Sequence, residues 1–353
     1  MCSVPETPIR LFVGPANFAA QGFRLARAAE RIDGVGAVNM QRILQRGYNF
    51  PADLQVPQRV YKHSLRWQRK HFEHISRNFT HVILEAELPL FGGFFGGDVV
   101  AEIAALRARG VSVALLSHGT DLRGPDLHAS RDPASPFNDQ GHPEIARLRA
   151  VTTRNRSVLA RAAAPVFVTT PDLLMDWPAA EWIPVVIDPE LWHTDKPVLQ
   201  AARPRVVHAP TNPWIKGSEL IEPMLLRLHE EGIIEYQQLV DIPADEMPAV
   251  YHGADIVLEQ FRIGTYSVTA VEALAAGRIV VAHLFDDVRA HVENAVSREL
   301  PVIEATVETL EATLREVCSD PVRFVEHAAV GPDFVREVHD GRRSAALLEA
   351  FLH

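Results

Sequence analysis

Two stretches decide the fold: Arg205-Val-Val-His-Ala-Pro-Thr-Asn-Pro-Trp-Ile-Lys216-Gly217 and Gly264-Thr-Tyr-Ser-Val-Thr-Ala-Val-Glu272-Ala-Leu-Ala-Ala-Gly277-Arg-Ile-Val-Val-Ala282. Each couples a short apolar strand to a turn of small residues and the start of a helix, where backbone N–H groups and the helix dipole hold phosphate. The first turn carries Lys216, and the helix of the second stretch carries Glu272. A cation for a diphosphate and a carboxylate for ribose hydroxyls predict a site for a nucleotide sugar.

The two stretches resemble the donor-binding half of a retaining glycosyltransferase of the GT-B fold, in the bacterial glycosyl-transferases-group-1-like family. Further matches lie in Gly14-Pro-Ala-Asn17, Ser117-His-Gly-Thr-Asp-Leu-Arg123 and Ile183-Pro-Val-Val-Ile-Asp188. The resemblance covers nearly the whole chain in the right order, and it is silent on which sugar is moved. It implies an α/β fold with two Rossmann-like, doubly wound parallel-sheet domains that face each other across a cleft.

Length and composition bound the class of protein. At 353 residues the chain suits two domains, and 47% hydrophobic with 23% charged residues is ordinary globular composition. A net charge of −10 excludes a general nucleic-acid binder. The N-terminus shows no signal peptide, and no run approaches the ~20 apolar residues of a membrane span. Cys2 and Cys318 lie in no metal or redox spacing, so we expect a cytoplasmic enzyme.

The alternation of apolar and amphipathic stretches predicts α/β domains. We expect an acceptor-side domain over residues 1–190, a donor-binding domain over 191–331 after a linker at Thr194–Pro204, and a C-terminal helix within 332–353 that packs back on the first domain. Expected strands are Ile9–Val13, His81–Glu85, Val111–Ser117, Val166–Thr169, Trp182–Ile187, Arg205–Ala209, Ile234–Val240, Asp255–Leu258 and Ile279–Ala282. Expected helices are Gln21–Ile32, Val99–Arg109, Ser218–Glu231 with a kink or 3₁₀ turn at Pro223, Asp245–His252, Ser267–Ala276 and Phe334–Leu352.

Lys216 is the predicted catalytic cation. An ammonium at a strand–turn–helix junction can neutralise a diphosphate leaving group, although a solvated surface lysine is the commoner fate of this residue type. The relatives often carry an arginine five residues earlier, where this chain has Thr211. Thr211 and Asn212 are therefore expected to contact the nucleotide sugar as neutral donors.

Glu272 stands in an apolar helix, where it lies on a solvated face or is held for a purpose, because an unpaired glutamate is costly to bury. The resemblance implies that this carboxylate binds the ribose hydroxyls. The resemblance also implies a second glutamate eight positions earlier, but Gly264 stands there. Thr265, Tyr266 and Ser267 are expected to supply phosphate contacts at the helix start. A packing role for Tyr266 is an equally good interpretation.

The first domain offers two candidate turns. Gly14 and Asn17 follow the first strand, where small residues let a sugar or diphosphate approach the backbone, or form an ordinary turn. His118 and Asp121 follow the strand Val111–Ser117. His118 is expected to orient the sugar or acceptor and Asp121 to take the acceptor proton, unless both serve only the loop backbone.

The chain lacks an Asp-x-Asp pair, and Asp286-Asp287 are adjacent rather than alternating. We therefore expect no obligatory metal and no cofactor beyond the donor substrate, with Lys216 and helix dipoles replacing the ion.

A basic segment recurs at helical spacing through Arg59, Lys62, Arg66 and Arg69, joined by His63, Lys70 and His71. We expect this Arg59–His71 face to contact an anionic membrane or a lipid-linked acceptor; a solvated helix face is the alternative. The nearby Phe91–Gly97 segment is either an acceptor loop or a connection that packs its phenylalanines inward.

The sequence thus predicts transfer of a sugar from a nucleoside diphosphate to a glycan, lipid-linked or small-molecule hydroxyl acceptor, in bacterial glycan or metabolite synthesis. A sugar-nucleotide epimerase shares this fold. A catalytically silent subunit that partners another glycosyltransferase is the third interpretation.

Overall fold

The computed structural model describes residues 1–44 and 50–353, which divide into two compact units. Unit 1 comprises Met1–Gly124, Pro143–Val186 and Gly341–His353, and unit 2 comprises Pro125–His142 and Ile187–Asp340. This division differs from the sequence-based one in three places. The boundary between the domains falls after Val186 rather than after residue 190. Pro125–His142, which we call the arm, joins unit 2 although it lies inside the first half of the chain, and residues 332–340 also belong to unit 2.

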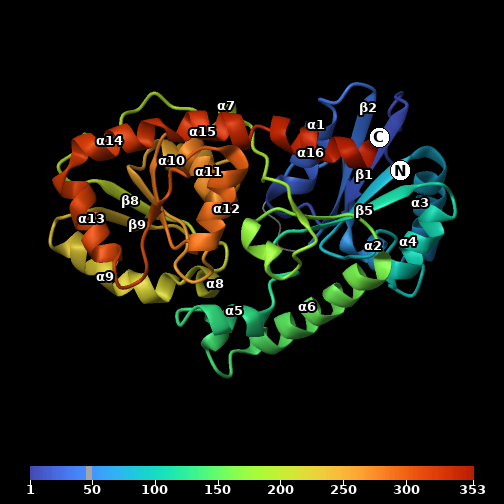
Figure 1. Ribbon diagram of the computed structural model, residues 1–353, viewed down its shortest axis with the longest axis horizontal. Coiled ribbons are helices and arrows are strands. Elements are labelled where there is room, and N and C mark those ends of the chain that lie inside the picture. The colour runs from blue at the N-terminus through green and yellow to red at the C-terminus, as the bar shows by residue number, and fades with distance from the viewer. Residues whose placement is uncertain (45–49) are drawn as a thin grey trace. The chain divides into compact units, whose positions relative to one another are not determined.

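Unit 1 is built on a seven-stranded parallel sheet with strand order β3-β2-β1-β4-β5-β6-β7 (Figure 1). Its strands are β1 Ile9–Gly14, β2 Val35–Ile43, β3 Leu54–Pro57, β4 His81–Glu85, β5 Ser112–Ser117, β6 Val166–Val168 and β7 Glu181–Trp182. Successive side chains of a strand point to opposite faces, and β1 shows the result. Leu11 and Val13 pack with Leu348 of the last helix, whereas Phe12 contacts the rings of His71 and Phe79.

The helices of unit 1 therefore cover both faces of its sheet, with α1 and α16 side by side on one of them (Figure 1). They are η1 Phe18–Ala20, α1 Gln21–Ala29, α2 Gln58–His63, α3 Leu65–Asn78, α4 Val99–Arg107, α6 Pro143–Ala162, η3 Pro171–Leu174 and α16 Arg342–Leu352. The parallel order, buried on both faces, is that of a doubly wound α/β domain.

Unit 2 contains a five-stranded parallel sheet with order β12-β11-β10-β8-β9. Its strands are β8 Arg205–His208, β9 Glu235–Gln238, β10 Ile256–Leu258, β11 Ile279–Ala282 and β12 Ile303–Glu304. Its helices are α5 Pro125–Arg131, η2 Pro136–Asn138, α7 Pro189–Trp192, α8 Pro213–Lys216, α9 Ser218–Glu230, α10 Met247–His252, α11 Val268–Ala275, α12 Asp286–Val296, α13 Leu310–Ser319, α14 Pro321–Ala329 and α15 Gly331–Val338. The core joins Val206, Ile256 and Val281 to Leu225 and Leu314.

Two expected elements are interrupted, each by a residue with a clear backbone reason. The strand predicted over Trp182–Ile187 ends with β7 at Trp182, because Pro184 has no N–H to continue the ladder. The helix predicted over Phe334–Leu352 is two helices, α15 and α16, which break at Gly341. Gly341 has φ 98°, a left-handed conformation that favours glycine.

The kink expected at Pro223 is absent: α9 runs without a break from Ser218 to Glu230. Pro223 removes one helical hydrogen bond, which is usually costly in a helix interior. Here Pro223 is exposed to solvent, so water can hydrate the carbonyl that loses its partner.

The basic segment is not one helix, because Ser64 ends α2 and caps α3 by accepting a hydrogen bond from the Trp67 N–H. His71 is also not part of the basic face. It is fully buried and stacks on Trp67 at 4.7 Å between ring centroids. Burial lowers the pKa of His71 to about 3, so its imidazole is neutral. Phe91 of the Phe91–Gly97 segment is buried and packs on Phe72, as in the inward-packing interpretation.

Candidate functional site

Strand register brings the polar strand ends of each unit together. In unit 2, Leu258 pairs with His208 and with Val281, so the turn after β8, Glu259 and His283 meet at one edge of the sheet. In unit 1, Gly14 pairs with Leu84 and Glu85 pairs with Leu116, which aligns the turn after β1 with His118. The carboxyl ends of parallel strands are where ligands bind in α/β domains.

In unit 2, Lys216 is held by two partners that follow β10. Its Nζ lies 3.1 Å from Oε1 of Glu259 and 3.3 Å from Oγ of Ser267, the residue that precedes α11. Ser267 Oγ also donates a hydrogen bond to Glu259 Oε1. The Glu259 side chain is fully buried, and its Oε2 has no hydrogen-bond partner among the described residues. The arrangement fixes an ammonium beside the N-terminus of α11.

The backbone around Lys216 is equally constrained. The Lys216 carbonyl accepts a hydrogen bond from the Phe261 N–H at 3.0 Å, and Gly217 turns the chain at φ 79°. His208, fully buried, bonds the Leu258 carbonyl at 2.9 Å and Ser218 Oγ at 2.8 Å. Burial, together with the nearby Lys216 charge, lowers the pKa of His208 to about 4. This histidine is neutral and ties β8, β10 and α9 together.

The other predicted donor-site residues of unit 2 differ in their exposure to solvent. Thr211 and Asn212 are exposed, and Asn212 caps α8 by accepting a hydrogen bond from the Ile215 N–H. Thr265 and Tyr266 are buried, and the Tyr266 hydroxyl lies 3.3 Å from His339 Nε2. Of the side chains predicted around the start of α11, only Ser267 contacts Lys216 among the described residues.

Glu272 lies in the second turn of α11 and is half-buried. Burial of Tyr251 is the main cause that raises the pKa of its hydroxyl well above the usual value, and the negative charge of Glu272 adds to this effect. The carboxylate thus lies close enough to Tyr251 of α10 to act on it electrostatically.

Gly264 explains the missing first glutamate. Its φ is 62°, and a Cβ atom built there would lie 2.4 Å from the Phe285 ring. A glutamate at this position would be strained and would clash. A fully buried carboxylate lies five residues earlier in the chain, at Glu259.

The arm is anchored on unit 2 by Arg262, which sequence reasoning missed. This arginine is 3% exposed, and its guanidinium forms a bidentate pair with Asp139 at 2.7 and 2.8 Å. It also donates to the carbonyls of Ala134 and Ser135. Asp139 accepts a further hydrogen bond from Trp214 Nε1 at 2.8 Å. The arm is thereby tied both to the loop after β10 and to the turn that carries Lys216.

A second contact joins the arm to the loop after β11. His283 lies 3.1 Å from Asp132 of the arm and 2.8 Å from Glu304. Burial disfavours its charge, but the two carboxylates outweigh burial and raise the pKa of His283 to about 9. Arg131 stacks over the Phe285 ring with 4.2 Å between the guanidinium carbon and the ring centroid. The arm thus contacts all three loops that follow β8, β10 and β11.

In unit 1, the turn after β1 binds a carboxylate of the protein itself. Ala16 and Asn17 donate their N–H groups to Glu85 at 3.0–3.1 Å, and Glu85 is fully buried. A Cβ at Gly22, in the first turn of α1, would lie 2.5 Å from the Glu85 carboxylate. This turn was predicted to receive a sugar or diphosphate, and Glu85 occupies its N–H donors.

Gly14 and Asn17 therefore have structural partners. A Cβ at Gly14 would lie 3.1 Å from the Met40 carbonyl, so close strand packing accounts for this glycine. The Asn17 side chain accepts from the Phe23 N–H at 2.8 Å and donates to Gln41 and to the Pro51 carbonyl. The Asn17 side chain stabilises this turn through these hydrogen bonds.

His118 and Asp121 lie together after β5. Nε2 of His118 is in ion-pair contact with Glu85 Oε1 at 3.2 Å, and its Nδ1 has no hydrogen-bond partner among the described residues. Burial opposes protonation, but Glu85 and Asp121 prevail and raise the pKa of His118. Asp121 accepts hydrogen bonds from the N–H groups of His118 and Gly119 at 2.8 and 2.5 Å. Its carboxylate shapes this loop.

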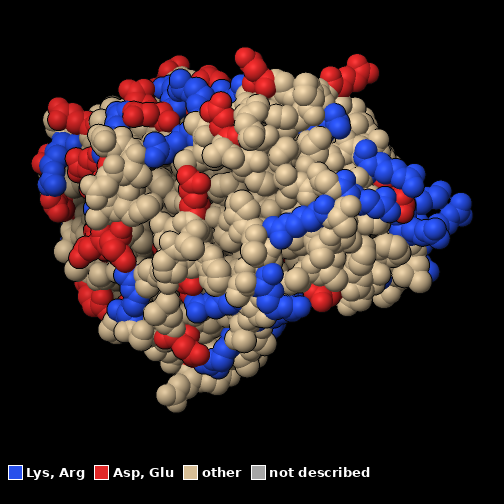
Figure 2. All heavy atoms as spheres, turned by 45° about the vertical axis from the view of Figure 1, so that its right-hand side comes forward, with Lys and Arg blue, Asp and Glu red and all other residues tan. Residues whose placement is uncertain are grey.

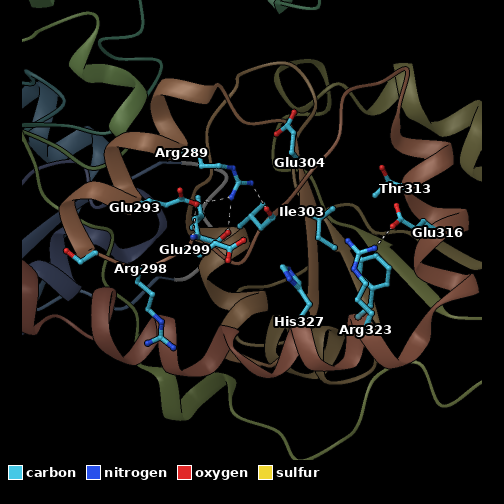
Figure 3. Close-up of a pocket in the computed structure, with 14 residues that line it drawn as sticks. Arg289, Glu293, Arg298, Glu299, Ile303, Glu304, Thr313, Glu316, Arg323 and His327 are labelled. Carbon is cyan, nitrogen blue, oxygen red and sulfur yellow. Dashed lines mark hydrogen bonds and ion pairs between the residues drawn. The ribbon is translucent and has the colours of Figure 1, made fainter.

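Each unit contains a cavity. One cavity in unit 1, of about 440 Å³, is lined by His118, Asp121 and three arginines. The one in unit 2, of about 860 Å³, lies among α12, α13 and α14. Figure 3 shows its Arg323 directed at Glu316 and its Arg289 hydrogen-bonded to neighbouring groups, so its cations are already neutralised. No cluster of His, Cys, Asp or Glu suited to a metal ion occurs in residues 1–44 and 50–353.

No family model and no curated protein sequence matches the chain. Solved structures do match along nearly all of both chains. HepE from Anabaena, solved with UDP and glucose, superimposes with a TM-score of 0.61 at 12% identity over 97% of this chain and 98% of that one. Sucrose-phosphate synthase from Thermosynechococcus elongatus gives 0.59 at 12% identity over 98% of each chain.

UDP-GlcNAc 2-epimerase from Neisseria meningitidis, bound to UDP-GlcNAc, gives a TM-score of 0.52 at 13% identity over 97% of this chain and 99% of that one. At such identities a likeness establishes the fold alone. The chain has the GT-B fold, with two parallel-sheet α/β domains, as the sequence predicted.

Asp139→Ala should loosen the arm from unit 2. The change removes the bidentate partner of the buried Arg262 guanidinium and leaves the exposed Glu219, 3.4 Å away, as its described carboxylate, at a cost of about 2 kcal/mol of arm docking. Because trypsin cleaves transiently opened segments, cutting after Arg131 should be about 30-fold faster. Mass spectrometry of a timed digest measures it, and Asp333→Ala, which removes an exposed surface pair, is the control. Equal cutting rates in both variants would show that the pair does not hold the arm.

Proposed function

We propose that this protein is a glycosyltransferase that moves a sugar from a nucleoside diphosphate to a hydroxyl acceptor with retention of anomeric configuration. The bond between the anomeric carbon and the diphosphate oxygen breaks, and the acceptor oxygen forms the new bond. The acceptor proton passes to the departing diphosphate, so no nucleophile of the protein is required. A bacterial glycan or a glycosylated metabolite, made in the cytoplasm, is the proposed product.

The observation that carries this proposal is the position of Lys216. Its ammonium is 11% exposed and lies beside the start of α11, where unpaired N–H groups and the helix dipole favour an anion. Glu259 and Ser267 restrict the lysine to that place before any ligand arrives, and preorganised charge is the main electrostatic contribution to such reactions. Glu272, further along α11, is the proposed ribose ligand.

Two alternatives share the fold. An epimerase acts on the sugar nucleotide without an acceptor, and a silent subunit binds a partner and turns nothing over. Thr211, at the position where relatives carry an arginine, favours the silent subunit. Assays of donor hydrolysis, transfer and epimerisation on the purified chain separate the three, and a thermal-shift screen of nucleotide sugars identifies the donor.

We also propose that the enzyme docks on an anionic membrane through a basic surface of α2 and α3. Its members are exposed and form no ion pair with a described residue: Arg59, Lys62, Arg66, Arg69 and Lys70. Leu65, which is 67% exposed, lies among them. Figure 2 shows Lys and Arg side chains gathered on the right of the face it presents. Within the described part of the chain, no helix could cross a bilayer.

Lys216→Ala should lower turnover by two or more orders of magnitude, because loss of a key transition-state donor costs ~3–4 kcal/mol. Steady-state kinetics with the identified donor measures it. Lys196→Ala, at an exposed lysine of the same unit, is the matched control and should retain wild-type turnover. Near wild-type turnover of Lys216→Ala with unchanged nucleotide affinity would refute the role.

Activity should need no divalent metal, because Lys216 and the α11 N-terminus supply the positive charge that an ion would otherwise provide. Turnover in excess EDTA should match turnover with added Mg²⁺ or Mn²⁺. A complete loss in EDTA that one of these ions reverses would contradict the proposal.

Wild-type protein should co-sediment with phosphatidylglycerol vesicles at low salt and dissociate at higher salt. Each basic residue near an anionic surface contributes about 1 kcal/mol, screened over ~8 Å at physiological ionic strength. The Arg59/Lys62/Arg66/Arg69→Glu variant should remain in the supernatant, and neutral phosphatidylcholine vesicles should bind neither protein. If wild type and variant sediment equally poorly, the surface is only solvated.

A further inference from the structure

The 440 Å³ cavity of unit 1 is lined by basic and apolar side chains. It lies at the carboxyl ends of β4 and β5 and along α6. Its polar lining includes Arg42, Arg147 and Arg154 together with His118, Asp121 and Asn155. Its apolar lining includes Phe18, Leu88, Leu148 and Val151. Three arginines at one cavity are a marked excess in a chain of net charge −10.

The structure holds one of these arginines in a defined orientation. Asn155, fully buried, receives two hydrogen bonds from the Arg154 guanidinium on its Oδ1, at 2.7 and 3.0 Å. The amide of Asn155 is itself fixed, because its Nδ2 donates to the Asp121 carbonyl at 2.8 Å. The buried amide of Asn155 therefore fixes the orientation of the exposed Arg154 guanidinium. An arginine that served only to be solvated would not need such support.

The positive charge of the cavity is largely uncompensated. Arg42 forms no ion pair with a described residue, and its guanidinium contacts the Tyr61 ring at 5.8 Å. Arg154 forms none either, and Arg147 pairs only with the solvent-exposed Glu144, an interaction that solvent screens. The one carboxylate of the lining, Asp121, already accepts two backbone N–H groups.

Glu87 is a buried carboxyl near this cavity, and its environment works against a negative charge that would offset the arginines. Burial and the nearby Asp121 raise the pKa of this carboxyl well above its usual range, which disfavours its charged form. The cavity therefore combines three arginines, two of them without a described carboxylate partner, with apolar side chains in its lining. Cavities of this volume hold ligands of small-molecule size.

We propose that this cavity binds the acceptor and that the acceptor is a small molecule with an anionic group, a phosphate or a carboxylate, held by Arg42 and Arg154. The assignment of the ligand as acceptor rests on the proposed transferase function. Guanidinium groups bind phosphate and carboxylate oxygens through paired N–H donors, which fits either anion. The buried imidazole of His118, whose Nδ1 has no partner in the described structure, lies in the same wall and is placed to meet an acceptor hydroxyl.

Calorimetry with matched probes tests the inference: glucose 6-phosphate, glucuronate and glucose, each titrated into the full chain. At least one anionic probe should bind about tenfold or more tightly than glucose, a preference that two guanidinium contacts readily supply. Arg42→Gln and Arg154→Gln should each remove most of that preference. Arg161→Gln, an exposed arginine on the same helix but outside the cavity, should keep it.

Anion binding at the donor site gives a different pattern. A preference that Lys216→Ala abolishes, and that Arg42→Gln and Arg154→Gln retain, would overturn the inference, as would equal binding of all three probes. Melting temperatures with UDP, ADP and GDP are measured on the same preparations. If a nucleotide binds but the sugars do not discriminate, only the acceptor assignment fails. If the arginine-dependent preference holds but no nucleotide binds, the cavity stands and the transferase proposal fails.

Discussion

A buried carboxylate at the end of a central strand is the constraint on which both units depend. Burying an ionised glutamate is costly unless it is paired, so the surrounding loops must bring donors to it. Glu85 ends β4, next to β1, and Glu259 follows β10, next to β8, so the two glutamates occupy equivalent places in their sheets. In each unit the strand-end turns are arranged around that carboxylate.

The two units satisfy this constraint with different donors. Around Glu85 the donors are backbone N–H groups of the first turn, so the anion-binding capacity of that turn is used by the protein. Around Glu259 the donors are Lys216 and Ser267, which leaves the backbone N–H groups at the start of α11 for a ligand. This difference supports the proposal that the donor phosphates bind to unit 2 and that unit 1 binds another molecule.

Strand and helix periodicity predicted the fold class and most elements, because short-range patterns determine them; β4 and β11 have the predicted bounds. The strand Val35–Ile43 was missed because Gly36, Asn39 and Gln41 interrupt its apolar pattern, although Asn39 is buried and hydrogen-bonded. Lys216 was identified from its turn. Its partner Glu259 was not, since a glutamate after an apolar strand looks like an ordinary exposed strand end.

Arg262 and the arm lay beyond sequence reasoning for a different reason. The Arg262–Asp139 pair joins residues 123 positions apart, and nothing local to either residue indicates the other. One signal was present: Asp132, Asp139 and several prolines give the segment 125–142 a turn-rich composition unlike the helices around it. Such a composition predicts a loop, but it cannot indicate which unit the loop packs on.

The two cavities differ in whether their arginines are paired with carboxylates. Arg289, Arg298 and Arg323 line the larger cavity, and each has a carboxylate partner, so that cavity attracts no anion strongly. Arginines without a described carboxylate partner include Arg59, Arg66 and Arg69 on the α2–α3 surface and Arg42 and Arg154 in the 440 Å³ cavity of unit 1. Uncompensated charge costs stability through self-repulsion, and anionic ligands of the kind proposed for these two places would neutralise it there.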